Sequence, residues 1–207
     1  MIIECFTIGL YQTNSYVITD ENTKLSAIID PAGVSKEMEE YVESNKLIVK
    51  YIIFTHGHFD HIAGAYHYSQ KYKPEILINA DDSACLTDET ANFTYPAYYD
   101  FLPVKPTTLL IDNDEISLGN SKIRVIHTPG HTMGGICLYS DGVLISGDTL
   151  FYRSIGRTDF KGGNFSTLKD SILKLYKLPD NTVVYPGHGC STILGEEKVK
   201  NPFVRAE

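Results

Sequence analysis

The placement of histidine is the feature of this sequence that most limits how it can fold. The chain has seven histidines, and three of them fall within six residues, in the segment 56–61 (HGHFDH). Residues two apart in an extended segment point the same way, so His56 and His58 can face one metal ion. A turn into a helix would redirect Asp60 and His61 toward a neighbouring point. Because three imidazoles buried together without a metal would stay unsatisfied, the segment predicts a metal site.

Three further donors stand where expected strands end. His131 follows a strand and the turn 128–130, Asp148 follows the apolar run 143–145, and His188 follows the strand 182–184. Each has glycine beside it, which lets the backbone bring a donor close to an ion. Functional groups commonly occupy such loops, because a rigid scaffold positions them. We therefore expect these three residues to join the segment 56–61 in one site.

The donor set predicts two metal ions. Five imidazoles and two carboxylates are too many for one tetrahedral zinc, and they suit zinc or iron(II) better than calcium or magnesium. Asp148 belongs to neither histidine cluster and is the expected bridge. Two divalent ions, two carboxylates and a hydroxide leave a small positive charge, which would attract an anionic substrate. His67 and His127 are expected to be structural, with His127 at most supporting a ligand indirectly.

Apolar runs and turn residues predict the secondary structure of both halves. The expected strands are 2–8, 15–19, 26–29, 48–54, 75–79, 116–118, 123–127, 136–139, 143–146 and 182–185. The expected helices are 35–45, 62–72, 166–178 and 195–200. Two halves, each with strands first and helices after, predict two sheets packed face to face with helices outside. The length predicts one domain over residues 1–207.

Charge, hydropathy and cysteine usage exclude several classes of partner. The formal net charge is −8, which disfavours nucleic acid. No uninterrupted apolar run approaches the roughly 18–20 residues that span a bilayer. The first residues show no basic stretch ahead of an apolar core, so we expect no signal peptide and a cytoplasmic location. The four cysteines form no CxxC, which is typical of free thiols in a reducing compartment.

The ordered set HxHxDH, PGHT, GDT and PGHG, which spans residues 56–188, resembles the metallo-β-lactamase superfamily. The resemblance implies an α/β fold, a four-layer αβ/βα sandwich of two mixed β-sheets with helices on the outer faces. It also implies two ligand triads and a bridge. The first metal would be held by His56, His58 and His131, the second by Asp60, His61 and His188, and Asp148 would be shared.

A closer resemblance is to the short, single-domain glyoxalase II-like hydrolases. It rests on the stretches GDTLF (147–151), IGRTDF (155–160), YPGHG (185–189), TILGEE (192–197) and NPF (201–203). The family activity is hydrolysis of S-acyl glutathione thioesters such as S-lactoylglutathione. Full-length members continue into a C-terminal glutathione-binding helical domain, which we do not expect here. Arg157 stands in place of a glutathione-binding lysine, and Asp159 and Cys190 in place of two tyrosines.

The resemblance implies that a metal-bound hydroxide attacks the thioester carbonyl, with Asp60 and Asp148 as catalytic residues. The expected cofactor is one or two zinc ions, with iron or manganese as alternatives. Thiolate leaves readily, since an ordinary thiol has a pKa of about 8.5, so no separate general acid is needed. Asp60 would orient the hydroxide. Arg157 would bind a substrate carboxylate or, alternatively, pair with Asp159.

Other functions remain open on the sequence alone. A persulfide dioxygenase with one iron also carries a GRTDF-like stretch, and a non-catalytic metal-binding protein could use the same scaffold. A lactonase is a further alternative, whereas β-lactamase and nuclease activities are disfavoured. The aromatic segment Tyr95–Phe101 is expected to be a loop held by its own side chains, with a lid or a subunit contact as alternatives. The acyl group, the thiol carrier and the oligomeric state stay undetermined.

Overall fold

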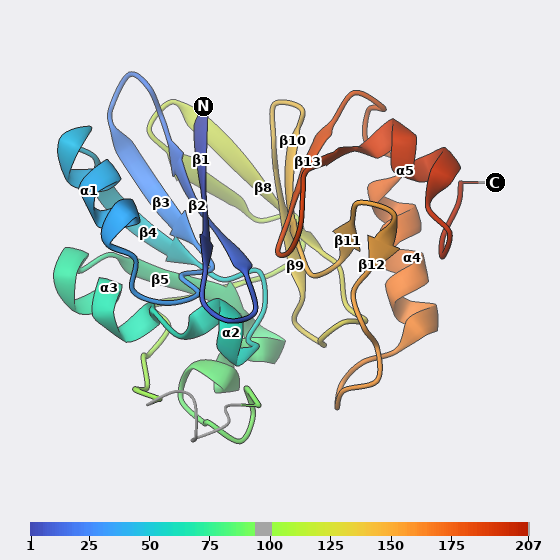
Figure 1. Cartoon of the computed structure of the whole chain (residues 1–207), viewed down its shortest axis with the longest axis horizontal. Helices are drawn as coiled ribbons and strands as arrows, with labels where there is room; N and C mark the ends of the chain where they lie inside the picture. Colours follow the sequence, from blue (N-terminus) through green and yellow to red (C-terminus); the bar gives the residue numbers. More distant parts are fainter. Residues whose placement is uncertain (94–100, 207) are drawn as a thin grey trace.

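Two six-stranded sheets form the centre of the computed structural model, which describes residues 1–93 and 101–206 (Figure 1). In the first sheet the strands follow chain order, from β1 to β6. The first three strands pair antiparallel, and β3 to β6 pair parallel. The bounds are Ile2–Ile8 (β1), Thr13–Thr19 (β2), Leu25–Ile29 (β3), Ile48–Ile53 (β4), Glu75–Asn79 (β5) and Thr108–Leu110 (β6).

The second sheet has the order β14-β13-β10-β9-β8-β7. Only β10 and β13 pair parallel, so this sheet is mixed as well. The bounds are Glu115–Leu118 (β7), Ser121–His127 (β8), Ile136–Ser140 (β9), Val143–Gly147 (β10), Val183–Pro186 (β13) and Thr192–Ile193 (β14). A separate small hairpin of β11 (Leu150–Phe151) and β12 (Ser154–Ile155) follows β10 in the chain.

Helices cover the outer face of each sheet. On the first sheet lie α1 (Lys36–Ser44) and α3 (Ala65–Tyr72), and on the second lie α4 (Phe165–Leu175) and α5 (Leu194–Lys200) (Figure 1). The short α2 (Phe59–Ile62) and the 3₁₀ helix η1 (Ala80–Leu86) stand at the end of the sheets. The expected four-layer sandwich of two mixed sheets with outer helices is therefore confirmed.

Side chains that alternate between the two faces of each sheet divide the core into three apolar layers. In β3 and β4, Ile29 and Ile53 point between the two sheets, whereas Ile28 and Ile52 point toward the helices. The second sheet does the same, and its Leu144 packs against α4 and α5. Adjacent strand residues point to opposite faces, and all five of these side chains are fully buried or nearly so. Both faces of each sheet are covered, which makes the scaffold rigid where the chain leaves the strands.

The helix expected over residues 62–72 is wrong in one respect, because it is broken into α2 and α3. The break falls at Gly64, whose N–H donates to the carbonyl of Pro31 at 2.7 Å. A Cβ there would come within 2.7 Å of the carbonyl oxygen of Gly33. The close approach to the loop after β3 therefore interrupts the helix. A second correction is that α4 ends at Leu175 and not at 178. Tyr176 caps the helix, and the N–H of Leu178 donates to the carbonyl of Leu175 at 2.9 Å in the turn that leads to Pro179.

Some features lie outside the expected elements or outside the described residues. The short strands β6, β11, β12 and β14 and the helix η1 were not expected. The aromatic segment 95–101 lies outside the described residues except for Phe101, which packs against the layer between the first sheet and its helices. Within the described part of the chain, no helix combines the length and apolar character needed to cross a bilayer.

Candidate metal centre

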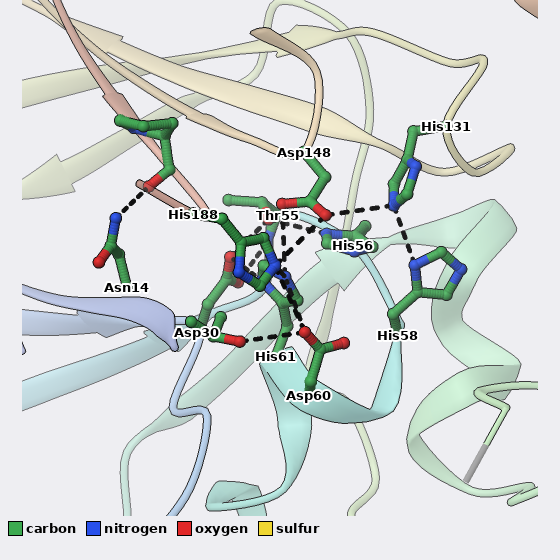
Figure 2. Close-up of polar contacts among 12 residues, drawn as sticks. Asn14, Asp30, Thr55, His56, His58, Asp60, His61, His131, Asp148 and His188 are labelled. Atoms are coloured by element: carbon green, nitrogen blue, oxygen red, sulfur yellow. Dashed lines mark hydrogen bonds and ion pairs between the residues drawn. The ribbon is translucent and has the colours of Figure 1, made fainter. Parts of the chain in front are cut away.

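The structure brings all seven expected donors together at one end of the two sheets (Figure 2). His56 and His58 follow β4, and Asp60 and His61 lie in α2. The other three follow strands of the second sheet, with His131 after β8, Asp148 after β10 and His188 after β13. The site thus lies where loops from both sheets meet, as the sequence pattern predicts.

Three buried histidines form a first group of donors, and we call it the first triad. It comprises His56, His58 and His131, whose ligand atoms all lie within 4.8 Å of one another. The His58 Nδ1 and His131 Nε2 atoms are 2.9 Å apart. None of the three residues is more than 6% exposed. The nitrogen of His58 that faces the centre is therefore Nδ1, whereas His131 uses Nε2.

The second triad comprises Asp60, His61 and His188, whose ligand atoms also lie within 4.8 Å of one another. The Nε2 atoms of His61 and His188 are 3.3 Å apart, and Asp60 Oδ2 lies 3.4 Å from His188 Nε2. Thr13 in β2 donates its hydroxyl to the same oxygen of Asp60 at 3.0 Å. The second triad is thus held between α2 and the loop after β13, with support from the first sheet.

Asp148 lies between the two triads (Figure 2). Its Oδ2 atom is 3.5 Å from His131 Nε2 and 3.6 Å from His188 Nε2, and its Oδ1 atom is 3.4 Å from His61 Nε2. One carboxylate therefore reaches members of both groups. This is the position that the sequence analysis expects of a bridging ligand.

Asp30 orients histidines of both triads. Its Oδ2 atom accepts a hydrogen bond from His61 Nδ1 at 2.9 Å and from the Thr55 hydroxyl at 2.5 Å. Its Oδ1 atom accepts from the Thr55 backbone N–H at 2.7 Å, and the Thr55 hydroxyl accepts from His56 Nδ1 at 3.1 Å. These bonds use Nδ1 of both rings, so each Nε2 is left to face the centre.

Backbone carbonyls orient the remaining Nε2 donors in the same way. His131 Nδ1 donates to the carbonyl of Arg157 at 2.7 Å, and His188 Nδ1 donates to the carbonyl of Tyr11 at 3.1 Å. In both rings Nε2 is then the free lone pair that can bind a cation. The loops that carry Arg157 and Tyr11 therefore take part in building the site.

The titration behaviour of the site differs between the two triads. Burial and the neighbouring imidazoles hold the pKa of His56 well below its usual range and lower that of His58 to about 3. Burial also opposes protonation of His61, but Asp148, Asp60 and Asp30 outweigh it and raise the His61 pKa to about 10. His56 and His58 therefore offer neutral lone pairs, whereas the carboxylates around His61 favour a positive charge there. Both properties suit a bound cation.

Unpartnered polar atoms show that the residues fit metal ions. His56 Nε2 and Asp148 Oδ1 are buried and have no hydrogen-bond partner among the described residues. Buried polar atoms are nearly always satisfied, so such atoms at the centre of a donor cluster fit a bound cation. Nitrogen donors dominate, which suits zinc or iron.

A cavity of about 540 Å³ opens onto the centre. Donors of both triads and the shared carboxylate line part of it, namely His58, Asp60, His131, Asp148 and His188. The rest of the wall is mainly apolar and includes Tyr11, Phe59, Phe93, Phe151, Ile155 and Phe160. A cavity of this size accommodates a small molecule with a sizeable apolar part.

Arg157 also lines this cavity, but its guanidinium is engaged by Asp159. Two hydrogen bonds of 2.8 and 2.7 Å join the two side chains, and the guanidinium lies 3.8 Å from the centroid of the Phe160 ring. The bonds to Arg157 lower the pKa of Asp159 to about 2. The structure therefore shows the ion pair that the sequence analysis gives as the alternative role, while Arg157 keeps its place at the cavity wall.

The two histidines expected to be structural lie outside the donor cluster. His67 bonds Glu39 at 2.5 Å, and His127 Nε2 bonds the carbonyl of Met133 at 3.0 Å. Sequence reasoning missed Asp30, which follows the expected strand 26–29. Its positive φ of 48° marks a special backbone position, but the contact to His61 spans 31 residues and leaves no local signal.

This sandwich with paired donor triads at one end defines a metallo-hydrolase. The sequence-family model of the metallo-β-lactamase superfamily matches residues 8–188 of this chain. The chain belongs to the metallo-β-lactamase superfamily.

Individual relatives differ in the activity that their names give. Hydroxyacylglutathione hydrolase GloC of Haemophilus influenzae is 34% identical over the full length of both chains. The crystal structure of the B3 metallo-β-lactamase BLEG-1 covers 98% of this chain and 99% of its own, with a TM-score of 0.88 and 32% identity. The crystal structure of TTHA1623 in a di-iron-bound form covers 97% of this chain and 100% of its own, with a TM-score of 0.86 and 29% identity. The crystal structure of ETHE1 from Myxococcus xanthus covers 100% of this chain and 86% of its own, with a TM-score of 0.82 and 28% identity.

Proposed function

We propose that this chain hydrolyses small-molecule anionic thioesters of the hydroxyacylglutathione type, with zinc as the first candidate for two bound metal ions. Similarity to a hydroxyacylglutathione hydrolase over both full chains supports the reaction. The seven expected ligands, two triads and a shared Asp148, support the pair of ions. The di-iron form of TTHA1623 keeps iron as an alternative metal.

The position of Asp148 carries this proposal. Its carboxylate reaches both triads and lines the cavity at the same time. A pair of bound metal ions would supply a water with a pKa near 7 and an electrophile for the thioester carbonyl. Asp60 and Asp148 both line the cavity, which supports their role beside a substrate that would meet the ions there.

The chain's own residues would hold the nucleophile and the substrate. Thr13 donates to Asp60 Oδ2, which fixes the carboxylate so that it can accept a hydrogen bond from the attacking water. The aromatic cavity wall would exclude bulk water and pack against apolar parts of the substrate. Thiolate needs no protonation to leave at neutral pH, given a thiol pKa of about 8.5. Arg157 would bind a substrate carboxylate once it leaves Asp159.

A persulfide dioxygenase is the second candidate function. The likeness to ETHE1 of Myxococcus xanthus favours it. That chemistry would need a single iron ion with open coordination positions for oxygen. The second triad, Asp60, His61 and His188, would then have no metal to hold. Metal stoichiometry therefore separates the two functions.

The test is to purify the protein without added metal, quantify its metals and assay three substrates. S-lactoylglutathione tests hydrolysis, glutathione persulfide with an oxygen electrode tests the dioxygenase, and a carbapenem tests the activity named for BLEG-1. We expect two metals per chain and thioester hydrolysis. Asp148→Ala and His58→Ala should lose metal and turnover but keep the fold, with His67→Gln as a histidine control outside the cluster. Parental turnover in either of the first two variants contradicts the proposal.

A further inference from the structure

One buried carboxylate outside the donor cluster contacts both loops that carry the first triad. Asp82 lies in η1 and is 4% exposed. Its Oδ2 atom accepts the backbone N–H of Gly57 at 3.0 Å, and its Oδ1 atom accepts that of Gly134 at 2.8 Å. Gly57 stands between His56 and His58, and Gly134 is three residues after His131. Both oxygens of one side chain are thus committed to the two loops that supply all three ligands.

Steric fit brings η1 directly against these loops. A Cβ on Gly57 would collide with Cys85, and one on Gly134 would lie 2.5 Å from the backbone nitrogen of Asp82. Only glycine allows such close approach at both positions. The short helix η1 therefore packs directly against the two loops of the first triad, and the Asp82 carboxylate holds both loops to it by hydrogen bonds.

The second triad is held by different contacts. Asp60 is fixed by Thr13, and His188 by the carbonyl of Tyr11. Asp30 reaches histidines of both triads, so it cannot distinguish between them. In the described part of the chain, the hydrogen bonds of the Asp82 carboxylate with backbone N–H groups all go to the first-triad loops. The Asp82 contacts therefore support the first triad alone, and changing Asp82 can test that triad without changing the contacts of the second.

We propose that Asp82 is a positioning residue that sets the metal affinity of the first triad selectively. It holds the loop 56–58 and the loop 131–134 at the separation that brings His58 Nδ1 and His131 Nε2 to 2.9 Å. Residues behind metal ligands commonly change metal affinity by 10–100-fold when replaced. The inference rests on the proposed metal-binding function and adds a residue that touches neither metal nor substrate.

The test isolates each triad by removing one histidine of the other. A His188→Ala background leaves the first triad complete, and a His131→Ala background leaves the second complete. Zinc affinity is measured in each background by competition with a chromogenic chelator. Asp82→Asn keeps the side-chain volume but turns an amide N–H₂ toward one of the two backbone donors. Asp81→Asn is the matched control, since Asp81 is the exposed neighbour in the same helix.

We expect Asp82→Asn to weaken zinc binding about 10–100-fold in the His188→Ala background. In the His131→Ala background, Asp82→Asn should leave the zinc affinity within about twofold of that background alone. Asp81→Asn should do the same in both backgrounds. Asp82→Ala, which removes both acceptors, should show the larger selective loss.

Equal weakening of both triads, as general unfolding would cause, overturns the inference, and so does unchanged affinity in both. If neither background binds zinc before Asp82 is changed, the metal assignment itself fails and this inference fails with it.

Discussion

The carboxylate of Asp30 lies 2.9 Å from Nδ1 of His61, on the side of the ring away from the donor cluster. The same oxygen accepts the Thr55 hydroxyl, which in turn accepts from His56. One buried acid therefore sets the orientation of two imidazoles, one in each triad. We therefore expect the metal affinity to depend on this acid as well as on the ligands.

Asp30→Asn should weaken both metal positions together. The amide oxygen can take the place of only one carboxylate oxygen. The N–H₂ group then faces a donor in the other place, either the Thr55 backbone N–H or the Thr55 hydroxyl and His61 Nδ1. We expect about 1–3 kcal/mol lower free energy of unfolding for the metal-free protein, and about 10–100-fold weaker zinc binding. Urea denaturation and chelator competition measure the two effects. Weakening confined to one triad would contradict this role.

Arg157 and Asp159 should control how well anionic substrates bind. Both side chains are more than half exposed, so their ion pair can open for a substrate carboxylate at small cost. Asp159→Asn should lower KM for S-lactoylglutathione about two- to fivefold without changing kcat, and Arg157→Gln should raise it. An uncharged thioester is the control and should respond to neither. Equal effects on both substrates would show that the pair acts on the fold and not on substrate charge.

Glu197 should anchor the hairpin that forms part of the cavity wall. Its fully buried carboxylate accepts from the Arg153 backbone N–H at 3.0 Å, from the Arg153 guanidinium at 2.6 Å and from the Thr192 hydroxyl at 2.7 Å. Glu197→Gln should lower the free energy of unfolding by about 3 kcal/mol. It removes the buried charge partner of the partly buried Arg153 guanidinium, which keeps only the more exposed Glu196 as an acidic partner.

Because the hairpin carries Phe151 and Ile155 of the cavity wall, KM should also rise in Glu197→Gln. Equilibrium denaturation measures the first effect and steady-state kinetics the second. The exposed Glu196→Gln is the control and should stay within about 0.5 kcal/mol. If the Glu197→Gln variant is as stable as the parent, Glu197 does not anchor the β11–β12 hairpin.

Asp20 should contribute an acid-sensitive part of the stability. The hydroxyl and N–H of Thr23 and the N–H of Asn120 bond its carboxylate and lower its pKa. A pKa that is lower in the folded state means stability that is complete above the unfolded pKa of about 3.9 and is lost as pH falls through the folded value.

Asp20→Asn should therefore flatten the decline of stability below about pH 4, which denaturation at pH 3 to 6 measures. Exposed Asp170→Asn serves as the control and should keep the parental decline. An unchanged slope in Asp20→Asn would show that these bonds do not favour the ionised carboxylate.

Local pattern predicted most of the scaffold and the donor residues. The alternation in β3 and β4 and the spacing of His56, His58, Asp60 and His61 are properties of a few neighbouring residues. The break at Gly64 was missed because it depends on contact with Pro31 in the loop after β3, 33 residues earlier in the chain. Long-range contacts of this kind leave no trace in hydrophobic periodicity.

The residues that orient the donors escaped prediction for the same reason. Asp30 directly follows a strand and Asp82 lies in a short 3₁₀ helix, and each is 25 or more residues from the groups it binds at the site. Acids are common at such places in a sequence, so neither position stood out. The engagement of Arg157 by Asp159 was weighed from the sequence but needed coordinates to be seen.

Anomalous diffraction from crystals of the zinc-loaded protein tests the central claim most directly. Two scattering peaks are predicted, one beside His56, His58 and His131 and one beside Asp60, His61 and His188, with the Asp148 carboxylate in contact with both. A single peak that leaves one triad empty at saturating zinc, or peaks that do not touch Asp148, would contradict the shared two-metal centre.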